Sequence, residues 1–111
     1  MTTETHEILA ALAVGRLEPL EGAVAVRDAE HESALEPRTL ALIKLAAMIA
    51  LDAPPVSFAW QVESAIELGA SPEEILDVLR AVAPQVGAPK VVAAAPEIML
   101  GLGLSLPGDR P

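Results

Sequence analysis

The sequence predicts an all-α, compact multi-helix domain of about five helices that associates with copies of itself. Small and straight-chain aliphatic residues supply most of the 52% apolar content, whereas aromatic residues make up only 2%. That composition favours close helix packing over strands, which prefer β-branched and aromatic side chains. A length of 111 residues corresponds to a single domain, which we expect over residues 1–111. Five short helices cannot readily bury this much apolar surface within one chain, so we expect an oligomer.

The first helix is expected from a cap at Thr2 or Thr3 to about residue 14, where Gly15 ends it. Its apolar stripe contains Ile8 and Leu9. The segment 15–34 has no regular period, because proline, glycine and several acidic residues interrupt it, and we expect an irregular excursion.

Two helices follow on either side of the break at residues 52–55. The second is expected from Pro37 to about residue 51, because proline is favoured at a helix start. Since its apolar residues surround the axis, it should be the central, buried helix. The third should run from Pro55 to about residue 68 and stop at Gly69. Four of its residues should face the core, namely Phe58, Val62, Ala65 and Ile66.

The clearest local signal is Ser71-Pro72-Glu73-Glu74, a capping box that should begin the fourth helix. Pro84 should kink or end that helix. A last helix is expected from about residue 88 to 102, bent at Pro96, and residues 104–111 should form a flexible tail. Four residues of the fourth helix should be buried: Ile75, Leu79, Val82 and Val86.

Composition excludes several classes of function. The chain contains no cysteine, so disulfides, thiolate nucleophiles and Cys-ligated zinc are excluded. A net charge of −9 with seven scattered basic residues argues against a nucleic-acid partner. The apolar run 40–51 is shorter than the ~20 residues that a membrane helix requires. We therefore expect no membrane partner, and the cytoplasm is the expected location.

No metal site or cofactor is expected. His31 lies within the acidic run 28–32, but neighbouring loop residues rarely converge on one ion, and a solvated acidic loop is the preferred interpretation. The sequence also contains no glycine-rich phosphate loop and no nucleophile elbow.

Taken in order, several pieces resemble the carboxymuconolactone decarboxylase and alkylhydroperoxidase D family. The first is Leu35-Glu36-Pro37-Arg38 ahead of an apolar helix, and the next is a helix ending in Glu67-Leu68-Gly69. Ala70 to Ile75 and Val86-Gly87-Ala88-Pro89 complete the likeness, whose core covers about residues 35–102. The resemblance implies an all-α fold whose protomers form homotrimers or homohexamers.

The resemblance also implies where a site would lie. In the redox branch of the family, a Cys-x-x-Cys pair begins the third helix and a histidine follows four residues later. Counting back from Gly69, these positions hold Pro54, Ser57 and Gln61, so the resemblance implies a divergent member that lacks this relay. A histidine at the Gln61 position is also typical of the decarboxylase branch. A shift of two residues would place Glu63 there instead.

Candidate site residues follow from this position. Ser57 and Gln61 lie one turn apart and would orient a mostly apolar ligand. Trp60 and Phe58 would form an apolar wall, or else anchor the core or a subunit interface. Lys44 stands alone in an apolar run; burial would favour its neutral form, which can act as a base, whereas the alternative is a surface lysine.

Two hypotheses remain open. In the first, the chain binds or transforms a small, partly apolar organic molecule without a cofactor, as a lyase or isomerase and not as a peroxidase. Gln61 and Lys44 would then be the catalytic residues, in a site between the second and third helices. In the second hypothesis, the chain is a non-catalytic oligomeric structural or interaction protein that kept the fold and lost the site.

Overall fold

The protein is all-helical over the residues that the computed structural model describes, 1–20 and 34–108. No strand occurs within these ranges, which confirms the predicted fold class. His31 and most of the expected irregular segment lie outside them. The helices are α1 (Thr3–Ala13), α3 (Pro37–Ala50), α4 (Pro55–Glu67), α5 (Pro72–Val86) and α6 (Ala88–Gly101).

The chain divides into two compact units, Met1–Leu35 and Glu36–Pro111. The first unit contains α1, which begins where the Thr2 hydroxyl accepts a hydrogen bond from the Thr5 backbone N–H at 3.1 Å. None of the α1 residues is buried, and Ile8 and Leu9 of its apolar stripe are exposed. Helix α1 therefore has no buried residue in the described part of the first unit.

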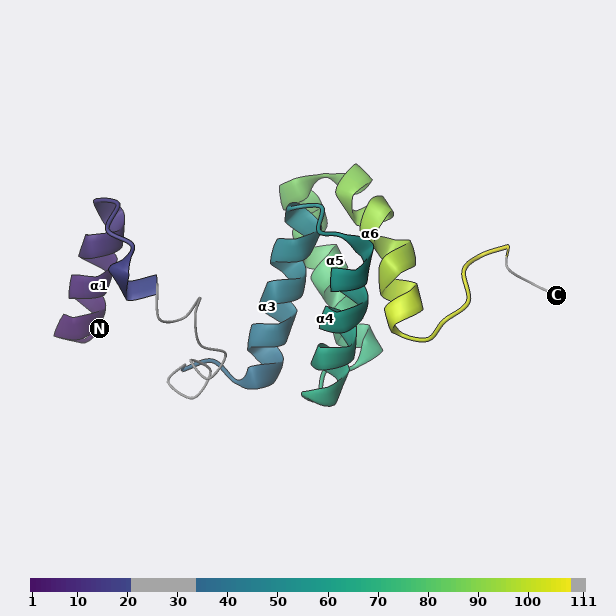
Figure 1. Ribbon diagram of the computed structural model, residues 1–111, viewed down its shortest axis with the longest axis horizontal. Helices are drawn as coiled ribbons and strands as arrows, with labels where there is room; N and C mark the ends of the chain where they lie inside the picture. Colours follow the sequence, from purple (N-terminus) through teal and green to yellow (C-terminus); the bar gives the residue numbers. More distant parts are fainter. Residues whose placement is uncertain (21–33, 109–111) are drawn as a thin grey trace. The chain divides into compact units, whose positions relative to one another are not determined.

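The second unit is a bundle in which α3 and α4 lie side by side and antiparallel, with α5 and α6 packed against them (Figure 1). Its core contains residues from all four helices. The largest fully buried side chains are Leu45 and Ile49 from α3, Val62 from α4 and Ile75 from α5. The described residues include no helix that is both long and apolar enough to cross a membrane.

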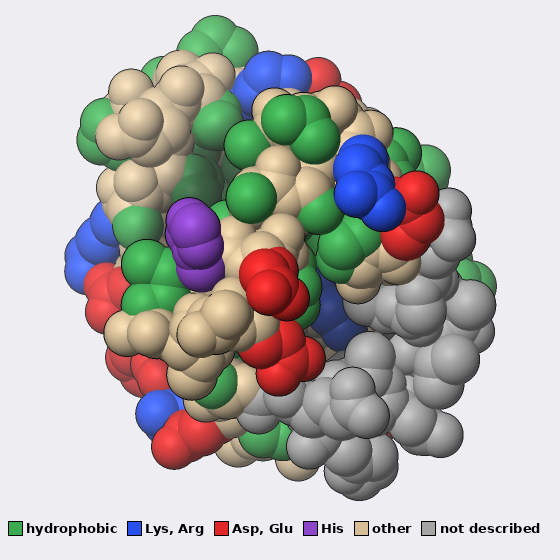
Figure 2. All heavy atoms as spheres, turned by 90° about the vertical axis from the view of Figure 1, so that its left-hand side faces the viewer, with side chains coloured by type: hydrophobic (Ala, Val, Ile, Leu, Met, Phe, Trp, Pro, Cys, Tyr) green, Lys and Arg blue, Asp and Glu red, His purple; other side chains and the backbone are tan. Residues whose placement is uncertain are grey.

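The prediction that α3 is buried on all sides is wrong for the single chain. Its inner face, with Ala41, Leu45 and Ile49, is buried, but Ile43 is half exposed and Leu51 is 79% exposed. Helices α4, α5 and α6 all contact α3, and its buried residues are spaced at i, i+4 and i+8, so they share a single face of the helix. Figure 2 shows one face of the molecule, on which hydrophobic side chains are exposed next to acidic and basic ones.

Two other core predictions need correction. Ile66 of α4 does not face the core and is 39% exposed, because it lies on the flank of α4 that turns towards the C-terminal end of α6. On α5, only Ile75 is fully buried; Leu79, Val82 and Val86 are partly buried and pack against the edge of the core.

The helix ends follow the predicted signals. Helix α4 ends before Gly69, which has a φ of 102°, and the Ala70 N–H then donates to the Ala65 carbonyl. Helix α3 ends in a similar way, except that the residue with a positive φ (52°) is Asp52 instead of glycine. Helix α5 continues for two residues beyond Pro84 and ends at Gly87, and α6 continues through Pro96.

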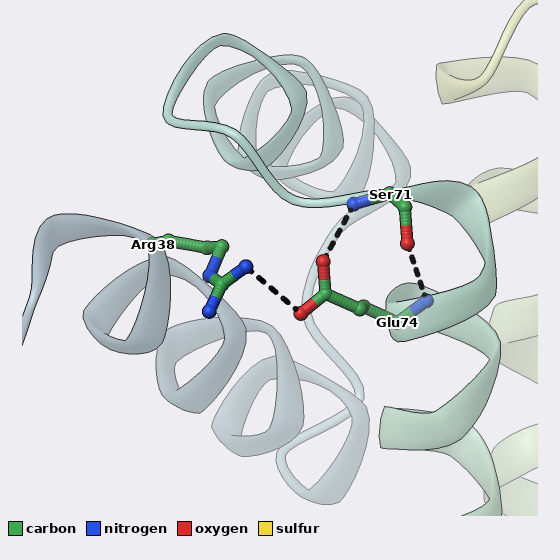
Figure 3. Close-up of polar contacts among 3 residues, drawn as sticks. All are labelled: Arg38, Ser71 and Glu74. Atoms are coloured by element: carbon green, nitrogen blue, oxygen red, sulfur yellow. Dashed lines mark hydrogen bonds and ion pairs between the residues drawn. The ribbon is translucent and has the colours of Figure 1, made fainter.

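The predicted capping box is present and has an additional partner (Figure 3). The Glu74 N–H donates to Ser71 Oγ at 3.1 Å, and the Ser71 N–H donates to Glu74 Oε1 at 3.0 Å. The second carboxylate oxygen of Glu74 lies 3.4 Å from Nη1 of Arg38, at the start of α3. One carboxylate thus links the beginnings of α3 and α5.

Candidate functional site

Helix α4 carries four of the five predicted site residues, and the structure places them on different sides of that helix. Side chains two positions apart point to nearly opposite sides of a helix with ~3.6 residues per turn. Phe58 is accordingly buried, with 4% of its surface exposed, whereas Trp60 is 67% exposed. The two aromatic residues therefore do not form one pocket wall within the chain.

Gln61 lies on the flank of α4 that faces α3. Its side-chain amide, at Nε2, donates a hydrogen bond of 3.0 Å to the Ala41 carbonyl oxygen. Gln61 is partly buried. The amide at this position therefore joins two helices, and glutamine has no proton to exchange in acid–base chemistry.

Ser57 and Lys44 complete the predicted set. Ser57 is partly buried, one turn before Gln61 on α4, and its backbone N–H donates to the Pro54 carbonyl at 3.0 Å. Lys44 is exposed on the outer side of α3 in the single chain. The burial that would make Lys44 a base is therefore not present within one protomer.

A cavity of about 140 Å³ lies on the other flank of α4, where the corner between α3 and α4 meets α6. We call it the corner cavity. Its floor is apolar and buried, because Ile49, Phe58 and Ala94 are each less than 5% exposed. Six further residues line it: Asp52, Ala53, Pro55, Lys90, Ala93 and Glu97.

The rim of the corner cavity is charged. Nζ of Lys90 in α6 lies 2.7 Å from Oδ2 of Asp52, an ion pair that joins α6 to the end of α3. Glu97 lies seven residues after Lys90 on the same helix face and also lines the cavity. An apolar floor below a few polar groups is the usual arrangement of a small-molecule site.

A second hollow, of about 400 Å³, lies at the opposite end of the contact between α4 and α6. We call it the acidic groove. Its lining residues are Glu63, Ile66, Glu67, Ala70, Pro72, Gly101 and Leu102. Of the five predicted site residues, only Phe58 lines either of these two hollows.

Asp52, Lys90 and Glu97 were not predicted as a group from the sequence. Two signals were available. Asp52 follows the last turn of α3, at the position where a helix usually ends in glycine with a positive φ. Lys90, Ala94 and Glu97 are spaced to share one face of α6. The contact between Asp52 and Lys90 depends on how the helices pack, and spacing along the sequence does not predict that packing.

These observations define a small all-α protein without cysteine, with an apolar cavity beside its central helix pair. A model of the carboxymuconolactone decarboxylase family matches residues 18–98. The chain therefore belongs to the carboxymuconolactone decarboxylase family. Searches of curated proteins and of solved structures found no match to this chain.

Proposed function

We propose that this family member binds a small, partly apolar organic molecule in the corner cavity, without a cofactor. The observation that carries the proposal is the buried apolar floor below the Asp52–Lys90 ion pair. An apolar cavity of ~150 Å³ accommodates a molecule of about one benzene ring. The proposed site keeps Phe58 from the predicted set and moves from the α3 flank of α4 to the α6 flank.

If the bound molecule is also transformed, the reaction is of the lyase or isomerase type, and the rim supplies the groups for it. The carboxylates of Asp52 and Glu97 are able to accept a proton, and the ammonium of Lys90 is able to balance a developing negative charge. Gln61 has neither capacity. In this proposal, Gln61 holds α3 against α4 and thereby helps to position the residues of these helices that form the cavity floor.

The proposal is tested by ligand-dependent thermal shifts with one-ring probes such as benzyl alcohol and benzoate. A ligand that binds only the folded state raises the melting temperature. The variant Ala93→Leu narrows the cavity, and Ala81→Leu adds the same side chain at an exposed site on α5. We expect the shift to disappear in Ala93→Leu and to persist in Ala81→Leu. Equal shifts in both variants would contradict the corner-cavity site.

The flank between α3 and α4, for which the sequence predicted a site with Ser57, Gln61 and Lys44, is the other place to test for a ligand. The substitutions Gln61→Leu and Lys44→Met approximately preserve side-chain volume while removing a polar group. If either weakens binding tenfold, about 1.4 kcal/mol, the site belongs on that flank. We expect a smaller effect from both, because neither residue lines the corner cavity.

The proposed function does not include thiol chemistry. The redox relay of the family requires two cysteines, and this sequence contains none. Without a thiolate, no side chain can attack a peroxide or a disulfide in the manner of that branch. We expect the pure, metal-free protein to turn over hydroperoxide no faster than a heat-inactivated control.

A second candidate function is a non-catalytic oligomeric protein, and the exposed apolar residues favour it. Four residues are each at least half exposed: Ile43 on α3, Leu51 directly after α3, and Val56 and Trp60 on α4. Such surfaces commonly mark protein–protein contacts. We propose a homotrimer or homohexamer; a monomer mass by light scattering at micromolar concentration would argue against this assembly.

A further inference from the structure

The acidic groove differs in chemistry from the corner cavity. Its floor is apolar: Ala70 is buried, Leu102 is partly buried and Ile66 is 39% exposed. Helices α4 and α6 approach closely at its base, where a Cβ on Gly101 would lie 3.0 Å from the Cβ of Val62. The helix contact closes the bottom of the groove, while its upper side is open to solvent.

All the charge in the groove lining has one sign. Glu63 and Glu67, one turn apart on α4, are the two charged residues that line it. Within the described ranges, neither carboxylate makes an ion pair, in contrast to Asp52 with Lys90 and Glu74 with Arg38. Like charges at this spacing repel each other and destabilise a helix by a few tenths of a kcal/mol. The pair therefore does not stabilise the fold.

We propose that the acidic groove binds an organic ammonium ion that carries an apolar body. The ammonium group would lie between Glu63 and Glu67 and relieve their repulsion, while the apolar body would cover Ile66 and Leu102. A volume of about 400 Å³ is within the usual range of small-molecule sites. The net charge of −9 also attracts cations to the chain and repels anions.

The test compares three probes of nearly equal shape: 2-phenylethylamine, neutral 2-phenylethanol and anionic 3-phenylpropionate. Binding is followed at low ionic strength by titration calorimetry, and its position by shifts of backbone amide signals. We expect the amine to bind at least tenfold more tightly than the alcohol, and the carboxylate not to bind. The shifted amides should be those of the groove, around Ile66, Ala70 and Leu102.

The decisive variant is the double substitution Glu63→Gln with Glu67→Gln, which removes two charges and approximately preserves shape. Its matched control is Glu7→Gln with Glu36→Gln, which removes two exposed carboxylates that line neither hollow. We expect the first pair to weaken amine binding at least tenfold and to leave alcohol binding unchanged. The control pair should change amine binding less than twofold.

Three results would overturn this proposal: no binding of the amine, equal binding of amine and alcohol, or equal loss in the two double variants. The third would mean that the net charge of the chain attracts the amine and the groove does not. Ala93→Leu separates this site from the corner cavity, since it should abolish the response to benzyl alcohol and leave the amine response intact. The proposal for the corner cavity and the proposal for the acidic groove can thus be contradicted independently.

Discussion

The two flanks of α4 use their polar groups differently. On the flank towards α3, the side-chain amide of Gln61 donates a hydrogen bond to the Ala41 carbonyl and so joins the two helices. On the flank towards α6, polar side chains stand at the edges of two hollows with apolar floors. Gln61 thus joins two helices of the fold, whereas both hollows lie on the other side of α4.

The comparison predicts its largest effect for the two aromatic residues of α4. Phe58→Ala should lower the free energy of unfolding by about 3–5 kcal/mol, because it empties a buried site. Trp60→Ala should change it by less than about 0.5 kcal/mol when the protein is dilute, because the side chain is exposed. Urea denaturation followed by circular dichroism measures both; similar losses would contradict the opposite placement of the two rings.

A smaller effect is expected where α4 meets α6 most closely. In Gly101→Ala, the new methyl group would lie 3.0 Å from the Cβ of Val62 and 3.3 Å from the Cα of Ala59. Overpacking of this kind costs ~1–3 kcal/mol, and the better helix propensity of alanine returns up to ~1 kcal/mol. We expect a net loss of stability of about 1–2 kcal/mol by the same measurement. A gain in stability would show that α6 can move away from α4.

The substitution Gln61→Leu tests how much the hydrogen bond between α4 and α3 contributes to stability. Loss of the hydrogen bond to Ala41 should cost about 1 kcal/mol, within the usual range for one intramolecular bond. Gln61→Glu should cost more, since a carboxylate cannot donate to that carbonyl. If both variants are as stable as the parent chain, the interhelical bond does not hold α3 and α4 together.

The smallest effect is expected from Asp52→Gly. The substitution removes an exposed ion pair worth about 0–1 kcal/mol, and it places glycine at a position with a positive φ. The two contributions oppose each other, so stability should change by less than about 0.5 kcal/mol. Ligand binding in the corner cavity should change more than stability does. A large loss of stability would instead make the Asp52–Lys90 pair a structural link.

Local signals in the sequence predicted the helices well. The capping box at Ser71, the stop at Gly69 and the proline starts at Pro37 and Pro55 all depend on residues close together in the chain. The burial pattern was predicted less well. Apolar residues all around α3 indicated a fully buried helix, but periodicity does not show whether the covering partner belongs to the same chain.

The candidate site was the least predictable part. The resemblance to the family directed attention to Ser57 and Gln61, and spacing alone could not show that Gln61 bonds to Ala41, twenty residues earlier. The sequence did not single out Lys90, since its partner Asp52 is 38 residues away. Contacts of this range depend on how the helices pack.

Trp60 is the single tryptophan of a chain that contains no tyrosine, so the ultraviolet fluorescence of the protein comes almost entirely from one indole ring. That ring is 67% exposed on the outer side of α4. Its emission should change little when the chain unfolds, since the ring is already in contact with water. It should move to shorter wavelength when another protomer covers it. The emission wavelength of Trp60 in the unlabelled protein should therefore report on assembly and change little on folding.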